Sequence, residues 1–571
     1  MVRKIWKFRN DKIKPGAVRA AAEKNNIPPI IASVLLNRGI AEQDFADFLS
    51  KSKKSIKNPM TMLDMDKAAE RIKSAVENKE KIVIYGDYDV DGITSTALLY
   101  DFLKSVDADV IYYIPDRKDE GYGINIMAVN KLIKKGMQLL ITVDCGITAI
   151  GEVEFAKLQG MDVVITDHHT CKERIPTAAV AVVNPKREDD DYGFDGLAGV
   201  GVAFKLVMAV AMSMGFKAGE YFERYCDLAA IGTIADVVPL VDENRVIVDR
   251  GLRKLASPSR PGLAELFKVA GLDGKRITAS SIAFGAAPRM NAAGRLGTAR
   301  TAVELLLTRD QSRAEEIALE LDKENRERQE TEQQIYREAL ELIAGDPNFE
   351  KKKVIVLAQE GWHNGVIGIV ASRITEMFYR PSILISMSEG SGKGSGRSIP
   401  GFNLFEALGT CEDLLTNFGG HAVAAGLGIT ENNLDEFTKR INKYADSVLD
   451  EKDLIPSVKI DAILNENSLN ISAAKAIAAL EPYGMGNERP VFVIKDAEAV
   501  QLSTVGAEGK HLRMTIRKNG VSAGCIGFGL GEYADEIAPG NMVHLAFRFD
   551  INHYKGSESL QLQLTDIKKA N

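Results

Sequence analysis

The sequence predicts a multidomain α/β protein that ends in a small β-barrel. Short β-rich runs alternate with helical windows between residues 81 and 183, which is typical of right-handed crossovers and a mainly parallel sheet. A second alternation of strands and helices begins after Pro347, and alternating apolar and polar residues dominate from Pro456 onward. At roughly 100–200 residues per domain, the 571 residues of the chain require more than one hydrophobic core.

The first segment is expected to be an N-terminal helical extension over 1–58. Residues 17–50 show helix-like apolar spacing with a break at Pro28 and Pro29, and the stretch KSKKS that follows is typical of a solvated joint.

A parallel-sheet domain is expected over 59–307. The runs IVIY, DVIYYI, LLITV, VVIT and AVAVV predict its strands, and windows 92–104, 124–135 and 148–159 predict its helices.

The remaining chain divides into a connector and two further domains. Thr308 to Ala344 is rich in Glu, Arg, Gln and Lys without a sustained heptad repeat, which favours a long solvated helix and a connector over 308–346. A second α/β domain is expected over 347–455. The alternating runs HLRMTI, VHLAFRF and LQLQLTDI predict a barrel of the OB type over 456–571.

Charge and cysteine content exclude several classes of protein. The 72 basic and 79 acidic side chains give a net charge of -7, so any polyanion site must be a local patch or a metal-filled cleft. The five cysteines form no C-x-x-C pair, which argues against a disulfide framework or a thiolate zinc site and favours a reducing cytosol. No apolar run approaches the length of a membrane span, so a cytoplasmic protein without membrane contact is expected.

Three acidic residues follow the first strand of the predicted sheet. Asp87, Asp89 and Asp91 stand at alternate positions, and carboxylates this close repel one another unless a cation neutralises them. A solvated acidic turn is the simpler alternative. An EF-hand loop is excluded, because its twelfth position holds Leu98 and a strand precedes the loop.

Polar residues also follow two later strands. Asp144 ends one run, and Asp167, His168 and His169 end another. Taken singly, Asp144 can be a helix N-cap and the histidines ordinary loop residues. Because parallel sheets gather ligand sites at the carboxyl ends of their strands, the combination favours a metal site, with Mn²⁺, Zn²⁺, Fe or Co as the ion, Mg²⁺ as an alternative, and two ions bridged by a carboxylate.

A further acid stands where an apolar stretch ends. This acid is Asp236 in AAIGTIADVVPL. Burying its charged carboxylate among apolar residues costs free energy unless the carboxylate is paired or binds a metal ion. A helix end before Pro239 is an equally good interpretation.

The glycine-rich stretch EGSGKGSGRS is not a P-loop, because Gly394 follows Lys393 where Ser or Thr is required. We interpret it as a loop and strand in which backbone N–H groups, Ser395 and Arg397 bind a phosphate, with a flexible turn as the alternative. His421 in GGHAVAAG either joins that pocket or caps a tight turn.

These motifs carry a family resemblance. In order, GDYDVDG, VDCG, the literal DHH of 167–169 and GTIADVVPL resemble the four motifs of the DHH phosphoesterase superfamily. GVIGIVASR, GSGRS and GGHAVAAG resemble its DHHA1 domain. Together with IPPIIASVLLNRG, YIPDRKDEGYG, LAGVGVAFKL, PRMNAAGRLG and EPYGMGNERPVF, they cover nearly the whole chain and resemble the bacterial exonucleases specific for single-stranded DNA.

The resemblance implies a two-metal enzyme that removes mononucleotides from the 5′ end of single-stranded DNA during repair and recombination. It assigns one ion to Asp89 and Asp144, and the other to Asp91, Asp144, His168 and Asp236. Two divalent ions, Mn²⁺ first and Mg²⁺ second, are the implied cofactors. Where many superfamily members have a histidine, this chain has Tyr85.

Further residues receive roles from the same resemblance. The implied catalytic residues besides the metal ligands are Asp87, His169 and Arg289, with Arg289 facing the scissile phosphate. Support of the metal ligands is the alternative role for Asp87 and His169. An exposed helix-end arginine is the alternative for Arg289. The implied substrate-binding residues are Arg117, Asn291, Arg295, Ser395, Arg397 and His421.

The barrel is expected to strengthen the binding of single-stranded DNA by stacking bases on aromatic side chains beside basic groups. Its candidates are Phe547, Arg548, Phe549, His553, Tyr554 and Lys555. Alternating phenylalanines more often form a core, so no single residue is assigned there. A single-stranded-DNA-binding protein and a DNA helicase are the implied protein partners, and a monomer is expected.

Three other functions compete with this interpretation. An oligoribonuclease or cyclic-dinucleotide phosphodiesterase with DHH and DHHA1 domains shares both motif sets, but it typically lacks the N-terminal extension, the PRMNAAGR segment and the barrel. A non-catalytic subunit of the replication fork is a different class, and it would have lost metal ligands that are intact here. The upstream motifs argue against aminoacyl-tRNA editing.

Overall fold

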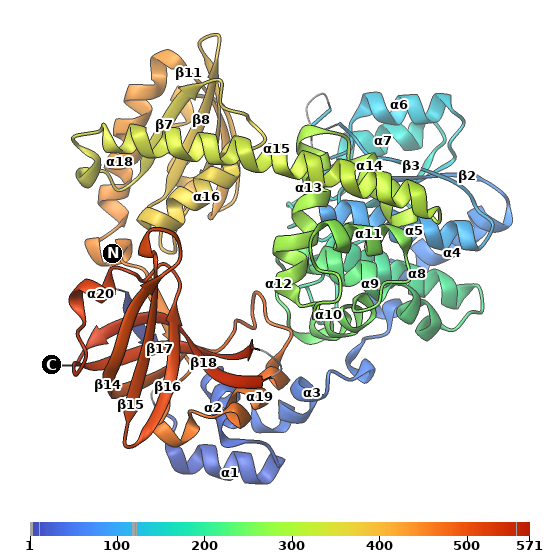
Figure 1. Ribbon diagram of the computed structural model, residues 1–571. Helices are drawn as coiled ribbons and strands as arrows, with labels where there is room; N and C mark the ends of the chain where they lie inside the picture. Colours follow the sequence, from blue (N-terminus) through green and yellow to red (C-terminus); the bar gives the residue numbers. More distant parts are fainter. Residues whose placement is uncertain (1–3, 11, 117–119, 122, 555–556, 571) are drawn as a thin grey trace. The chain divides into compact units, whose positions relative to one another are not determined.

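The computed structural model describes residues 4–10, 12–116, 120–121, 123–554 and 557–570 (Figure 1). The chain forms two compact units. The central unit comprises Asp47–Glu327 and Glu481–Glu488, and the flanking unit comprises Met1–Ala46, Arg328–Leu480 and Arg489–Asn571.

The central unit is built on a five-stranded sheet in the order β3-β2-β4-β5-β6, in which every neighbouring pair is parallel. Its strands are β2 (Lys81–Gly86), β3 (Asp109–Tyr113), β4 (Leu139–Val143), β5 (Asp162–Thr166) and β6 (Ala181–Val183). The predicted strands and the parallel sheet are therefore confirmed. The three predicted helices are confirmed as α5 (Val90–Ser105), α6 (Ile126–Lys134) and α7 (Ile150–Leu158).

Alternation along the buried strand β2 gives the sheet two apolar faces. Ile82 and Ile84 belong to one core, and Val83 and Tyr85 belong to the other. Helices α6 and α7 cover the second face, while α5 and a group of helices from later in the chain cover the first. That group includes α4 (Met65–Glu77), α8 (Gly199–Ser213), α9 (Ala218–Ala235), α10 (Asp242–Leu255), α11 (Pro261–Val269), α13 (Ala287–Leu296) and α14 (Ala299–Leu307).

The predicted long helix is confirmed as α15 (Gln311–Ala344). The division between the two units falls within it, after Glu327. Its C-terminal part is tied to the flanking unit, since Glu338 accepts a hydrogen bond from Trp362 Nε1 at 2.7 Å and Glu332 pairs with Arg373 at 3.0 Å. The expected domain boundaries at 58, 307, 346 and 455 stay predictions.

The second α/β domain contains a sheet in the order β10-β11-β9-β8-β7. Strands β7 (Ile355–Glu360) and β8 (Ser382–Ser388) are parallel, and β9 (Ser391–Arg397), β11 (Ala424–Thr430) and β10 (Leu415–Gly420) continue the sheet antiparallel. Its helices are α16 (Ile367–Phe378), α17 (Leu404–Gly409) and α18 (Leu434–Val448). The glycine-rich stretch is the strand β9, where a Cβ at Gly394 would approach Leu427 to 2.8 Å.

The predicted barrel is confirmed and is closed by pairing of β14 with β17. Its strands are β14 (Phe492–Val505), β15 (His511–Lys518), β16 (Val521–Gly527), β17 (Met542–Tyr554) and β18 (Ser557–Lys569), and the short β13 (Ala462–Ile463) joins β14. Phe547 and Phe549 are buried against Phe492, so they form the core of the barrel and cannot stack bases. Lys555 lies outside the described residues, as do the side chains of His553 and Tyr554.

The N-terminal segment contains the predicted helices α1 (Pro15–Asn25), α2 (Pro29–Asn37) and α3 (Phe45–Ser50). It also contains a strand that the sequence did not indicate, β1 (Ile5–Phe8), which pairs in parallel with β12 (Ser457–Ile460). Trp6 Nε1 donates to Asp566 Oδ2 at 2.6 Å. Residues 4–10 are therefore built into the barrel region.

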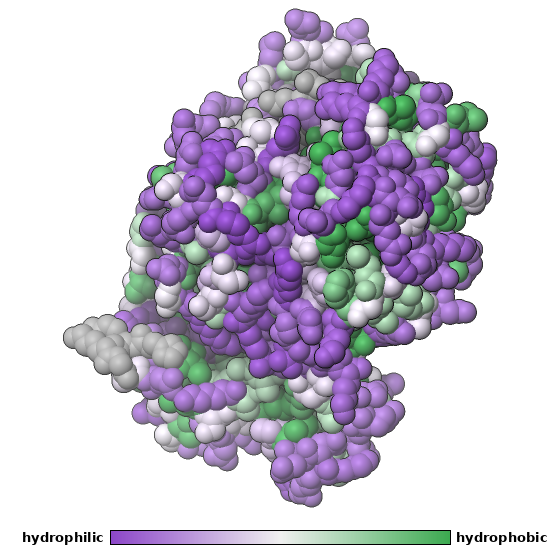
Figure 2. All heavy atoms as spheres, turned by 90° about the vertical axis from the view of Figure 1, so that its right-hand side faces the viewer, coloured by the Kyte–Doolittle hydropathy of each residue, from purple (hydrophilic) through white to green (hydrophobic). Residues whose placement is uncertain are grey.

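Within the described residues, no helix is long and apolar enough to cross a membrane. On the face shown in Figure 2, hydrophilic residues predominate and hydrophobic ones form separate patches.

Candidate metal centre

Acidic and imidazole side chains meet at the carboxyl ends of β2, β4 and β5. Among the residues that the structure describes, three groups have ligand atoms within 4.8 Å of one another: Asp87, Asp89 and Asp144; Asp91, His168 and Asp236; and Asp144, His168 and His169. The five predicted metal ligands are thus brought together, together with Asp87 and His169. Asp144 and His168 each belong to two of the groups, so the three groups overlap.

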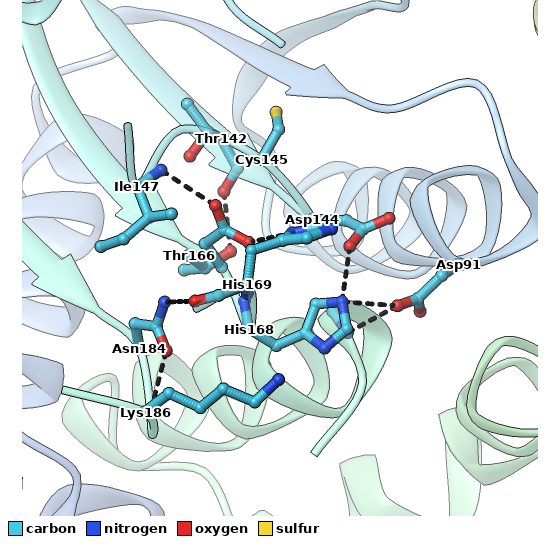
Figure 3. Close-up of polar contacts among 12 residues, drawn as sticks. Asp91, Thr142, Asp144, Cys145, Ile147, Thr166, His168, His169, Asn184 and Lys186 are labelled. Atoms are coloured by element: carbon cyan, nitrogen blue, oxygen red, sulfur yellow. Dashed lines mark hydrogen bonds and ion pairs between the residues drawn. The ribbon is translucent and has the colours of Figure 1, made fainter. Parts of the chain in front are cut away.

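His168 lies at the middle of the cluster (Figure 3). Its Nε2 is 3.2 Å from Asp144 Oδ1, 3.6 Å from Asp236 Oδ2 and 3.8 Å from Asp91 Oδ2. Burial, followed by the charge of His169, lowers the pKa of His168 to about 3. A neutral imidazole has one N–H and cannot satisfy three carboxylates, so a divalent cation fits this donor set.

Asp91 is held by the first turn of α8. Its Oδ2 accepts from the Gly199 N–H at 2.6 Å, and its Oδ1 accepts from the Val200 N–H at 2.8 Å. Burial, and then the Asp236 and Asp89 carboxylates, raise the pKa of Asp91 well above its usual range. The helix N-terminus fixes the orientation of a carboxylate that its acidic neighbours would otherwise repel.

Asp144 is nearly inaccessible, at 3% exposure, and has a left-handed backbone with φ of 61°. Burial, followed by the Asp91 and Asp89 charges, raises the pKa of Asp144 well above its usual range. The helix after it begins at Ile150, with Ala149 as N-cap, so the N-cap alternative for Asp144 is wrong.

The close approach of α8 to Asp144 requires a glycine. A Cβ at Gly199 would lie 2.6 Å from both Cβ and Oδ1 of Asp144. We therefore expect Gly199→Ala to displace Asp144 and to lower turnover by about a hundred-fold, the usual cost of misplacing a catalytic group by ~1 Å. Steady-state kinetics check this. Gly151→Ala, at a helical glycine with open space around it, is the matched control and should keep full activity.

The acidic loop after β2 is held by two helices. Asp89 caps α5 by accepting from the Gly92 N–H at 3.0 Å. Asn291 of α13 accepts from the Val90 N–H at 3.2 Å, and a Cβ at Gly294 would lie 2.4 Å from Tyr88 O. The PRMNAAGR helix therefore positions the acidic loop after β2. A substrate contact by Asn291 stays a prediction.

Asp167 has a role that the sequence alone left unassigned. Its Oδ1 lies 2.7 Å from His169 Nδ1 and also accepts the His168 and His169 N–H groups, while its Oδ2 accepts the Ile147 N–H. Although burial acts in the opposite direction, the His169 contact holds the pKa of Asp167 below its usual range. Asp167 therefore orients His169. In the sequence, the position of Asp167 as the first residue of the DHH motif indicated that it has a role in the site.

Tyr85, which stands in place of a family histidine, points away from the cluster. Its side chain packs in the core beneath α6 and α7, and its hydroxyl donates to Gly123 O at 3.0 Å.

Arg289 is engaged within the protein. Its Nε donates to Asp322 Oδ1 at 2.9 Å, its Nη1 donates to Gly285 O at 2.7 Å and its Nη2 donates to Val269 O at 3.3 Å. The exposed helix-end alternative is therefore wrong, and contact with a scissile phosphate stays a prediction. Arg295 is half-buried on the same helix. Arg117 lies outside the described residues.

The predicted phosphate residues lie in the flanking unit. Arg397 Nη1 donates to Ser395 Oγ at 3.2 Å and to Gly396 O at 2.7 Å. A Cβ at Gly368, in the first turn of α16, would lie 2.8 Å from Ser395 Oγ and 3.1 Å from Arg397 Nη2. A helix N-terminus, a hydroxyl and a guanidinium are therefore adjacent, as a phosphate site requires. His421 is exposed in the β10–β11 turn.

Metal affinity is expected to rise with pH. Burial, and then the Asp89 charge, raise the pKa of Asp236 to about 7. Below pH 7 an ion must displace this proton, so affinity should increase by about tenfold per pH unit for each proton displaced. Calorimetric titration with Mn²⁺ between pH 6 and 8 measures the slope. A pH-independent affinity would contradict the assignment of Asp236 as a ligand.

Comparison with known proteins supports the domain pattern. The profile of the DHH family N-terminal domain matches residues 81–233, that of the DHHA1 domain matches 351–447 and that of the RecJ OB domain matches 460–566.

Several characterised sequences and structures are similar to the whole chain. The single-stranded-DNA-specific exonuclease RecJ of Bacillus subtilis is 41% identical over 552 residues, covering 96% of this chain and 69% of its own length. The same enzyme of Haemophilus influenzae is 37% identical, over 91% of this chain and 93% of its own length. The crystal structure of RecJ in complex with Mn²⁺ from Thermus thermophilus is 32% identical with a TM-score of 0.84, covering 100% of this chain and 80% of that chain.

Proposed function

Because this chain belongs to the RecJ family, we propose that it hydrolyses single-stranded DNA from the 5′ end and releases mononucleotides, in DNA repair and recombination. The observation that carries the proposal is the cluster at the carboxyl ends of β2, β4 and β5, in which Asp144 belongs to two overlapping ligand groups. Such a cluster suits two divalent ions, and relatives have been crystallised with Mn²⁺ and with Mg²⁺.

We assign the ligands to the two ions as the motifs imply. Asp89 and Asp144, with Asp87 beside them, would hold one ion, and Asp91, Asp144, His168 and Asp236 would hold the other. When bound, two such ions acidify a water and neutralise the attacking and leaving oxygens of a phosphodiester. Mn²⁺ is preferred over Mg²⁺, because an imidazole stands among the carboxylates.

The chain itself supplies orientation and proton transfer. The first turn of α8 fixes the Asp91 carboxylate through two N–H groups. Asp167 holds Nδ1 of His169, which leaves Nε2 as the atom that can exchange a proton beside the cluster. Asp144 and His168 are almost fully buried, whereas Asp89, His169 and Asp236 are partly exposed, so the cluster can be reached from one side.

Recognition of the 5′ end is assigned to Ser395 and Arg397. What supports this is their contact with each other and with the first turn of α16. Arg397→Ala is expected to remove most of a ten- to hundred-fold preference for 5′-phosphorylated strands, the worth of one charge-assisted hydrogen bond. Competition between 5′-phosphorylated and 5′-hydroxyl strands measures the preference. If the variant keeps it, the phosphate pocket lies elsewhere.

The alternatives receive less support. An oligoribonuclease or cyclic-dinucleotide phosphodiesterase does not account for the matched OB domain, and a non-catalytic subunit does not account for the assembled metal ligands.

We further propose that the chain works as a cytosolic monomer alongside a single-stranded-DNA-binding protein and a DNA helicase. Free thiols at all five cysteines suit a reducing compartment. The protein partners follow from the substrate, because single strands in cells are coated and are generated by unwinding.

The proposal is tested with strands labelled at one end. With Mn²⁺, 5′-labelled single strands should release labelled mononucleotide at once, 3′-labelled strands should shorten progressively, and blunt duplexes should resist. EDTA should abolish all release. Release of labelled mononucleotide first from the 3′ end would contradict the polarity, and full activity in EDTA would contradict the metal mechanism.

A further inference from the structure

A lysine that the motifs did not single out stands beside the metal cluster. Strand β6 pairs in parallel with β5, so the residues after β6 emerge at the same edge of the sheet as residues 167–169. The third residue after β6 is Lys186. In Figure 3 its side chain extends toward the ring of His168, with the ammonium group at the near end. The sheet topology therefore brings a cation to the cluster.

The backbone on both sides of Lys186 is fixed. Asn184 Nδ2 donates to His169 O at 2.9 Å, and Asn184 Oδ1 accepts the Lys186 N–H at 2.9 Å. Asn184 has no exposed surface. On the other side, Arg187 Nη1 donates to Asp64 Oδ2 at 2.8 Å. The lysine side chain therefore starts from a defined point next to the DHH motif.

The charge of Lys186 acts on two of the candidate ligands. It adds to burial and to the charge of His169 in lowering the pKa of His168. It also opposes burial and the charge of Asp89, which raise the pKa of Asp236. Lys186 and Asp236 are both partly exposed, so the ammonium group lies on the accessible side of the cluster.

The described part of the chain gives this ammonium group no partner of its own. Lys186 forms no ion pair and no side-chain hydrogen bond there, whereas its neighbour Arg187 pairs with both Asp64 and Asp189. Arg289 is likewise engaged, by Asp322. Lys186 is therefore available to an anionic group from outside the chain.

The cluster needs more positive charge than two divalent ions supply. It contains five carboxylates besides that of Asp167, which is paired with His169. One negative charge therefore remains when two divalent ions are bound. A phosphodiester adds a second negative charge, and more charge develops on its oxygens during hydrolysis. A cation aimed at those oxygens stabilises the transition state.

We propose that Lys186 donates its ammonium group to a phosphoryl oxygen of the strand at the metal cluster, and so offsets the charge that the strand brings. The inference rests on the proposed hydrolysis of single-stranded DNA. A lysine suits this position, because its ammonium group is a compact charge on a flexible stem. The same charge repels divalent cations, so Lys186 should strengthen the use of the strand and weaken the binding of metal.

The test compares Lys186→Gln, Lys186→Arg and Lys157→Gln in the full-length protein. Glutamine removes the charge of Lys186, and arginine keeps it. Lys157 is an exposed lysine in the last turn of α7, without an ion pair among the described residues. Because α7 leads back to the amino end of β5, Lys157→Gln makes the same change in charge away from the cluster.

The hydrolysis arm measures kcat/KM for 5′-phosphorylated oligothymidylate at saturating Mn²⁺. Lys186→Gln should lower kcat/KM roughly ten- to a hundred-fold, the worth of one charge-assisted hydrogen bond. Lys186→Arg should keep most of the parent value, and the control should equal the parent. An unchanged Lys186→Gln, or equal losses in both Lys186 variants, would overturn the proposal. Inactivity of the parent itself would contradict the proposed function, and this inference with it.

The metal arm gives a readout that does not depend on activity. Calorimetric titration without DNA should show that Lys186→Gln binds Mn²⁺ more tightly, by roughly two- to ten-fold, because a positive charge beside the carboxylates has been removed. Lys186→Arg and the control should match the parent. Since only the folded cluster binds the ion, tighter binding also excludes misfolding as the cause of lost hydrolysis. Unchanged or weaker Mn²⁺ binding by Lys186→Gln would overturn the proposal.

Discussion

Asp144→Asn is expected to abolish hydrolysis while leaving the fold intact. Because Asp144 belongs to two of the three ligand groups of the cluster and is the proposed shared ligand, its loss should exceed the ~10²–10³-fold that removal of a single charge-stabilising donor costs. Single-turnover kinetics with saturating Mn²⁺ measure the effect. Asp66→Asn, an exposed acid of the same unit, is the matched control and should keep normal turnover.

Stability separates this effect from misfolding. In the metal-free protein, burial and the Asp91 charge raise the pKa of Asp144, so its ionised form destabilises the folded state. Asn resembles the protonated form, and the free energy of unfolding in EDTA should therefore be unchanged or increased. Normal turnover of the variant would show that Asp144 is not a shared ligand.

Glu243→Ala is expected to cause the largest loss of stability. Lys205 and Glu243 have no exposed surface and form an ion pair, and Glu243 also accepts from the Tyr192 hydroxyl and the Lys57 N–H. Removing one partner of a buried pair leaves an uncompensated charge, which costs ~3–5 kcal/mol. Urea unfolding, followed in the central unit by an engineered probe, measures the loss.

A double variant provides the control. Lys205→Met with Glu243→Gln removes both charges and keeps an acceptor for Tyr192, so it should recover most of the stability that Glu243→Ala loses. Equal destabilisation of the single and the double variant would show that packing, and not the orphaned lysine charge, causes the loss.

The sequence was sufficient to predict those parts of the structure that follow from a local pattern of apolar and polar residues. The strands from β2 to β6 and the helices between them follow from periodicity, and parallel pairing brings Asp89, Asp144 and His168 to one edge of the sheet. The long helix α15 and the closed barrel follow from the same kind of evidence.

The features that the sequence did not predict depend on contacts between residues that are distant in the chain. Strand β1 has four residues, which are too few to show the alternation of apolar and polar residues that predicts a strand, and its partner β12 begins at Ser457. The hydrogen bonds of Arg289 with Asp322 and of Asn291 with the Val90 N–H likewise join separate segments.

Two ions held in one cluster through a shared aspartate can be located individually. Anomalous diffraction at the manganese absorption edge, from crystals grown with Mn²⁺, shows each ion and its ligands. We expect two peaks in contact with Asp144, one also against Asp89 and the other also against Asp91, His168 and Asp236. A single peak, or two peaks of which only one contacts Asp144, would show that the aspartate is not shared.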